Sequence, residues 1–96
     1  MMIKLPFDLD RYFVRTSDTI EVPLSDLTIG SPHAIKKAEQ LMLAAYNGER
    51  QRRAPISIVP SIISGYRVID GSSTLANAVI HRWPTILAVV VEERNV

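Results

Sequence analysis

Residues 65–77 read GYRVIDGSSTLAN and join a strand, a corner and the start of a helix. The run Tyr66–Asp70 is rich in β-branched and aromatic residues, which is typical of a strand. Gly71 marks a turn, and apolar residues at helical spacing then predict a helix over Thr74–Arg82. The hydroxyl run Ser72–Thr74 lies between strand and helix. It either caps the helix or helps to hold an anion at the helix N-terminus.

The other segments extend this pattern to a small α+β domain. Alternation predicts a strand over Thr19–Leu24, and an apolar stripe predicts a helix over Ser31–Asn47 with Ser31 as its N-cap. Two further runs predict strands, Ile56–Val59 and Ile86–Val91, of which the second should be buried on both faces. The order is roughly β-α-β-β-α-β, which predicts a mixed sheet with two main helices.

The second helix is expected to bury one apolar face. That face would hold Leu75, Ala76, Val79, Ile80 and Trp83. Residues 1–18 contain apolar side chains that fit neither the helical nor the strand period. We therefore divide the chain into an N-terminal extension, 1–18, which packs across the domain or onto a partner, and a domain spanning 19–96.

Composition excludes several classes of protein. The chain has 96 residues, of which 47% are hydrophobic and 22% charged, and this predicts one globular domain. The formal net charge of +1 gives no global attraction to nucleic acid or to a membrane. There is no cysteine, which excludes disulfides and thiolate catalysis. No signal peptide is apparent and the longest apolar run is too short to span a bilayer, so we expect a cytoplasmic protein without a membrane partner.

Four segments together resemble the ParB/sulfiredoxin superfamily, specifically its ParB-like N-terminal (ParB-like nuclease) domain. They are TIEVPLSDL (19–27), RAPISIV (53–59), GYRVIDG (65–71) and STLANAVIHRWPTILAVVV (73–91). The resemblance covers about Thr19 to Glu92. It implies a domain that binds a nucleoside triphosphate, CTP or ATP with Mg²⁺, in a DNA-related process. In the family, a basic motif after the glycine grips phosphates, whereas here Ser72–Thr74 stand at those positions.

The candidate phosphate site is the corner Asp70–Thr74. Helix N-termini attract anions through their unpaired amides, and a glycine permits close approach of the backbone. Asp70 is the candidate catalytic and metal-binding residue, because its carboxylate could hold a metal ion or orient a water. The candidate phosphate-binding residues of the corner are Gly71, Ser72, Ser73 and Thr74.

A basic stretch, with Arg50, Arg52 and Arg53, is the second candidate. Together with Lys36 and Lys37 it could contact phosphates, either on a nucleotide or on a nucleic-acid backbone. Arg50, Arg52 or Arg53 would then replace the charge missing after Gly71. The alternative is a solvated connector whose charge complements the C-terminus of the first helix.

Two other functions stay open. The domain could have lost catalysis and act as a protein-interaction module, as a homodimer or with another protein. It could instead be a small ParB-like nuclease, for which the sequence offers no clear general base. Glu39 is expected on an exposed helix face, and His33 and His81 are expected to be ordinary helix and surface residues.

Overall fold

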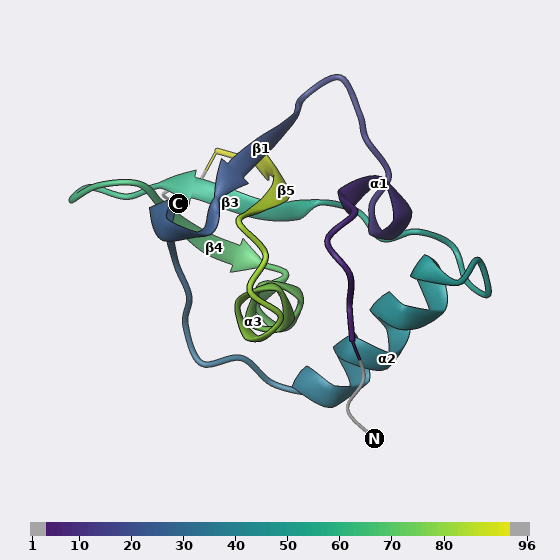
Figure 1. Cartoon of the computed structure of the whole chain (residues 1–96). Helices are drawn as coiled ribbons and strands as arrows, with labels where there is room; N and C mark the ends of the chain where they lie inside the picture. The colour runs from purple at the N-terminus through teal and green to yellow at the C-terminus, as the bar shows by residue number, and fades with distance from the viewer. Residues whose placement is uncertain (1–3, 93–96) are drawn as a thin grey trace.

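The computed structural model describes residues 4–92 as an α+β fold with a curled, mixed five-stranded sheet (Figure 1). The two longer helices lie together below the sheet in the view of Figure 1. The elements in chain order are α1 Leu9–Tyr12, β1 Thr19–Pro23, the 3₁₀ helix η1 Leu24–Asp26, β2 Leu27–Thr28, α2 Ile35–Tyr46, β3 Ile56–Pro60, β4 Tyr66–Asp70, α3 Ser72–Ile80 and β5 Thr85–Val90. The α+β class is therefore confirmed, while α1 and β2 were not predicted. The ends of the predicted extension and domain, residues 1–3 and 93–96, lie outside the described residues.

The sheet has the strand order β1-β5-β3-β4-β2. β5 pairs antiparallel with β1 and parallel with β3, whereas β4 pairs antiparallel with β3 and parallel with β2. The centre of β5, from Ile86 to Ala88, is completely buried, as its continuous apolar run predicted. Because β3 and β4 are antiparallel neighbours, the end of β4 at Asp70 lies opposite Ser57, near the start of β3.

The helix α2 begins later than predicted. Ala34 has a left-handed backbone with a φ of 53°, so the helix cannot extend back to Ser31 and begins at Ile35. Ser31 is therefore not its N-cap, and the prediction of that cap was wrong. The segment before α2 is held instead by α3, because the Ser73 hydroxyl donates a hydrogen bond to the carbonyl of His33.

The buried face of α3 also differs from the predicted one. Val79 and Ile80 are 55% and 58% exposed, although both were expected in the core. The helix instead turns Asn77 inward, where its Nδ2 donates to the carbonyls of Ile35 and Ser73, both at 2.9 Å. The bond to Ile35 joins α3 to the first turn of α2, whereas the bond to Ser73 lies within α3. The rotation that buries Asn77 leaves the Val79–Ile80 side facing outward.

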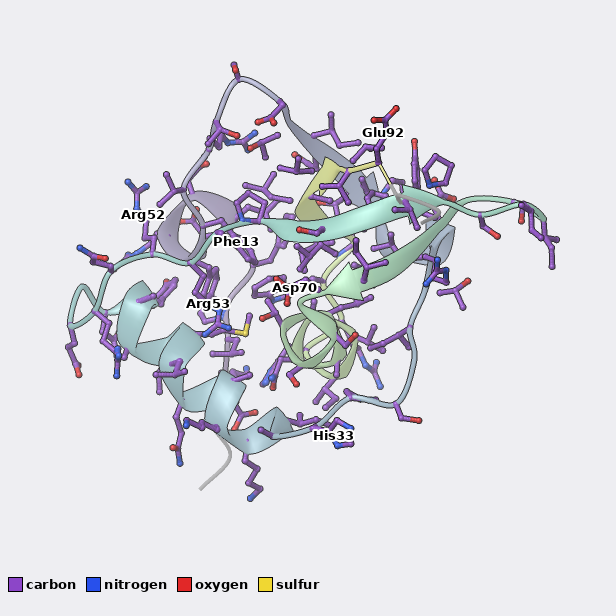
Figure 2. All side chains as sticks on the ribbon, turned by 180° about the vertical axis from the view of Figure 1, so that it is seen from behind. Phe13, His33, Arg52, Arg53, Asp70 and Glu92 are labelled. Carbon is purple, nitrogen blue, oxygen red and sulfur yellow. The ribbon has the colours of Figure 1, made fainter. Side chains whose placement is uncertain are left out.

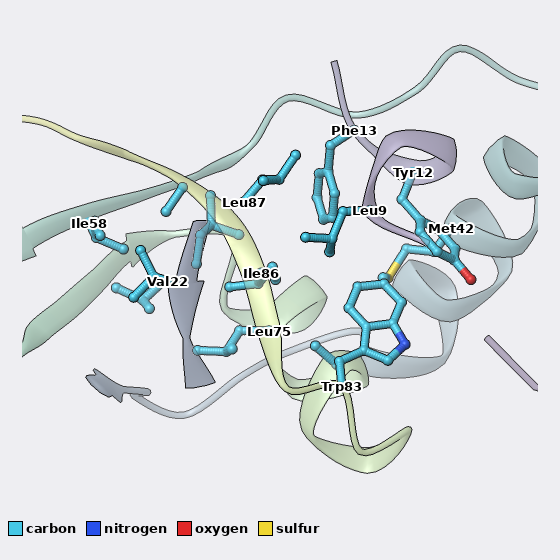
Figure 3. Close-up of a cluster of buried hydrophobic side chains, with 14 of the residues drawn as sticks. Leu9, Tyr12, Phe13, Val22, Met42, Ile58, Leu75, Trp83, Ile86 and Leu87 are labelled. Carbon is cyan, nitrogen blue, oxygen red and sulfur yellow. The ribbon is translucent and has the colours of Figure 1, made fainter. Parts of the chain in front are cut away.

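The N-terminal segment supplies part of the core (Figure 3). Tyr12 and Phe13 are completely buried, and the Tyr12 ring lies 4.7 Å from the Trp83 ring, centroid to centroid. The indole Nε1 of Trp83 donates to the carbonyl of Leu5 at 2.8 Å. A bridge between Phe13 and Arg53 then fixes the segment beside the connector that leads into β3. Residues 5–13 of the extension therefore pack across the domain.

Among residues 4–92, none of the helices has the length and apolar character needed to cross a membrane.

Candidate phosphate-binding corner

The corner between β4 and α3 depends on Gly71. Its φ is 100°, a left-handed value that residues with a Cβ rarely adopt. A Cβ at this position would lie 2.5 Å from Cγ2 of Ile56 on β3, which is shorter than any van der Waals distance between two carbon atoms. Gly71 therefore lets the chain turn sharply against β3, and the helix begins at the next residue.

The hydroxyl groups of Ser72, Ser73 and Thr74 do not cap α3. Gly71 occupies the N-cap position and no side chain makes a capping hydrogen bond. Ser73 uses its hydroxyl to hold the carbonyl of His33, and Thr74 is 3% exposed. Within the described residues, no acceptor is found for the amides of Ser72, Ser73 and Thr74. The first turn of α3 thus presents unpaired N–H groups, as any helix N-terminus does.

The connector brings Arg53 to this corner (Figure 2). A hollow of about 320 Å³ is lined by Arg53, Asp70, Gly71 and Thr74 together with the start of β3. A second hollow of similar volume extends from Arg53 and the corner to His33. The Arg53 backbone is fixed, because its N–H donates to Tyr12 at 2.7 Å and its carbonyl accepts from Val14 at 2.9 Å. No described residue makes a hydrogen bond or ion pair with its guanidinium.

Arg50 and Arg52 line neither hollow at the corner, although they share another hollow with Arg53. Both line a larger hollow of about 690 Å³ beside Arg11 and the C-terminus of α2. Arg52 Nη1 donates to the carbonyl of Asp10 at 2.9 Å, which ties the connector to α1. The C-terminus of α2 is complemented by Arg11, whose guanidinium donates to the carbonyl of Tyr46 at 3.1 and 2.7 Å and lies 4.0 Å from the Tyr46 ring. Of the basic stretch, only Arg53 therefore reaches the corner.

A metal ion at the corner would have few protein ligands. Asp70 is exposed, and among residues 4–92 no three His, Asp or Glu side chains gather closely enough to hold a metal. A Mg²⁺ ion held by the single carboxylate of Asp70 would need oxygens from a bound ligand and from water to complete its coordination shell.

Sequence reasoning missed two features. His33 lines the second hollow at the corner, although it precedes α2 and lies 40 residues from its hydroxyl partner Ser73. His81 and Glu39 form a pair at 3.1 Å, with side chains 12% and 19% exposed, so the expectation that both are surface residues was wrong. Neither contact could be predicted from the local sequence, because each joins α2, or the chain just before it, to α3 or its C-cap.

No protein-family model matches this chain, and no curated protein matches it significantly.

Proposed function

We propose that this protein is a ParB-like nucleotide-binding domain and that the corner Asp70–Thr74 holds the phosphates of a nucleoside triphosphate, CTP or ATP, with Mg²⁺. The observation that carries the proposal is the meeting of Arg53 with this corner in one hollow. Ser72–Thr74 stand where the family has its basic motif after the glycine, and Arg53 would supply a guanidinium from a different segment. Guanidinium groups form charge-assisted hydrogen bonds with phosphate and are suited to this role.

Each group at the corner has a part in phosphate binding. The unpaired amides of Ser72–Thr74 point along the axis of α3, where the helix dipole favours negative charge. The Ser72 hydroxyl is available to donate to a phosphate oxygen, whereas the Ser73 hydroxyl is occupied by His33. Asp70 would share a Mg²⁺ ion with the phosphates. Arg53 would face the phosphates from the opposite side of the hollow.

A thermal-shift screen tests the proposal. The protein is heated with CTP, ATP, GTP, their diphosphates or phosphate, each with and without Mg²⁺. A ligand at about a hundred times its dissociation constant stabilises the folded state by roughly 2.7 kcal/mol, which moves the melting temperature of a domain this small by about ten degrees. We expect a selective shift with one triphosphate.

Two arginine variants locate the site. Arg53→Gln should abolish most of the shift, whereas Arg50→Gln removes the same charge from a different hollow and should leave the shift intact. Equal losses of the thermal shift in both variants would show a general charge effect and would contradict the assignment.

Incubation of the same protein with plasmid DNA and Mg²⁺ tests the nuclease alternative, with Asp70→Ala as its control.

One observation favours the interaction module as a second candidate. Ile62 and Ile63 form the tip of the β3–β4 hairpin and are 103% and 91% exposed, so both side chains stand free of the rest of the described chain. Exposed apolar side chains of this size are typical of protein interfaces. Light scattering of the protein and of the double variant Ile62→Ser, Ile63→Ser tests this function. A monomer in both cases would count against a homodimer.

A further inference from the structure

A separate hollow lies at the other end of α3, away from the corner Asp70–Thr74. It measures about 550 Å³, within the range of small-molecule pockets, ~300–1,000 Å³. Two segments line it, the N-terminal run Lys4–Phe7 and the end of α3 with its turn, Ile80–Arg82. The hollow therefore exists only because the N-terminal segment packs onto α3.

Part of the lining of this hollow is apolar. Among its lining residues Leu5 is buried, while Phe7 and Ile80 are 47% and 58% exposed. Phe7 is fixed in place by edge contact with Trp83, with ring centroids 6.1 Å apart. Exposed apolar side chains around a concave surface favour an apolar ligand.

Two cations, Lys4 and Arg82, flank the apolar part. Neither side chain makes a hydrogen bond or ion pair with another described residue. Arg82 also has a left-handed φ of 59° in the turn after α3, where its N–H donates to Val79 and the N–H of Trp83 donates to Ala78. This is a Schellman turn, in which glycine is the residue of least strain. The backbone of this turn does not require an arginine, so the turn does not account for the guanidinium of Arg82.

His81 gives the hollow a rigid edge. Its Nε2 lies 3.1 Å from a carboxylate oxygen of Glu39 on α2, and its Nδ1 accepts from the N–H of Leu5 at 3.4 Å. The Glu39 carboxylate lies on the far side of the imidazole and does not line the hollow. The charges that face the hollow are thus the two cations.

We propose that the hollow between Lys4–Phe7 and Ile80–Arg82 binds a small amphipathic carboxylate, with its apolar chain against Phe7 and Ile80 and its carboxylate between Lys4 and Arg82. A single anionic head and a short apolar body complement the lining in both charge and polarity.

The test uses octanoate and a ¹⁵N-labelled sample of the full chain. Octanoate is titrated while the amide resonances of Leu5, Phe7 and Arg82 are followed. Octanamide keeps the apolar chain without the charge, and acetate keeps the charge without the chain. We expect octanoate to shift these resonances with saturation, octanamide to bind at least about fivefold more weakly, and acetate to produce no saturable shift.

Variants then assign the charge. Arg82→Gly removes the guanidinium and suits the left-handed turn, so the protein stays folded, and its affinity for octanoate should fall roughly fivefold or more. Lys4→Gln should act in the same direction, whereas Lys37→Gln, on the exposed side of α2, should have no effect. Absence of saturable binding, equal binding of octanoate and octanamide, or unchanged affinity in Arg82→Gly would each overturn the proposal.

Discussion

The imidazole Nε2 of His81 lies 3.1 Å from a carboxylate oxygen of Glu39, so the end of α3 is joined to the middle of α2. The two side chains are 12% and 19% exposed, which limits screening by solvent. The other ring nitrogen accepts from the N–H of Leu5, and the pair thereby links three segments that are far apart in the chain.

We expect His81 and Glu39 to be coupled energetically. Single substitutions His81→Ala and Glu39→Ala, with the double variant, form a cycle whose coupling should be about 1 kcal/mol. The measurement is the free energy of unfolding by urea for the four proteins. Additive effects of the two substitutions would show that the contact contributes nothing to stability.

Tyr12 should make stability fall at alkaline pH. Burial, and to a smaller extent the neighbouring Tyr46, hold the pKa of the Tyr12 hydroxyl well above its usual value. The folded state therefore favours the neutral phenol. Its contribution is complete below the ordinary tyrosine pKa, ~10, and is lost as the pH rises above that value and the unfolded chain ionises.

The variant Tyr12→Phe separates this effect from other titrations. It removes the hydroxyl that donates to the Pro6 carbonyl at 2.6 Å, so near neutral pH it should cost about 0.5–1.5 kcal/mol. The difference in unfolding free energy between Tyr12→Phe and the native protein should shrink above pH ~10. A difference that stays constant from neutral to alkaline pH would contradict the prediction.

Gly71→Ala should destabilise the protein strongly. A Cβ there would lie 2.5 Å from Ile56, and the φ of 100° strains any residue with a side chain, so we expect a loss of about 2–4 kcal/mol. Gly48→Ala is the matched control, since Gly48 has a φ of 77° but open space around it, and should lose only about 1 kcal/mol. Chemical denaturation of both variants checks the difference. Similar losses would mean that Ile56 moves aside without cost.

Arg82→Gly should stabilise the protein. Relief of the left-handed strain at a φ of 59° outweighs the greater freedom of glycine in the unfolded chain, which leaves a gain of about 0.5–1 kcal/mol. Arg82→Ala keeps the strain while it removes the guanidinium, and its stability should stay near that of the native protein. If Arg82→Gly were less stable than Arg82→Ala, the arginine side chain would have a structural role that the turn does not reveal.

Local patterns predicted the elements in which burial repeats with the period of the helix or strand. The apolar run of β5 is buried through Ile86, Leu87 and Ala88, and the stripe of α2 buries Ala38 and Met42, because these positions repeat with the period of their element. The boundaries of both helices were misplaced at their starts. At each start a left-handed residue, Ala34 or Gly71, sets the first turn, and in the case of Ala34 nothing in its residue type predicts that conformation.

Contacts between distant segments were beyond such patterns. The corner Asp70–Thr74 stays a predicted phosphate site. That Arg53 lies beside it, and Arg50 and Arg52 do not, depends on the path of the connector in the folded chain. Similarly, the side of α3 that faces α2 is decided by Asn77, a polar residue that no hydrophobic pattern selects. Such pairs depend on tertiary packing, which overrides local preference.

The N-terminal segment should be indispensable for folding. Tyr12 and Phe13 are completely buried, and Leu5 and Leu9 are 3% and 6% exposed, so a chain beginning at Thr19 would lose four core side chains. Full burial of each such side chain contributes about 1.5–3 kcal/mol, and their sum is comparable with the entire stability of a small domain, about 5–15 kcal/mol. We therefore expect residues 19–96 alone to lack a cooperative thermal transition by circular dichroism.

Point variants of the full chain test the same role. Phe13→Ala should lower the free energy of unfolding by about 3–5 kcal/mol, whereas Phe7→Ala should lower it much less because Phe7 is 47% exposed. A truncated chain that melts near the temperature of the full chain would contradict the prediction, because the remaining residues would then form a complete core without residues 1–18.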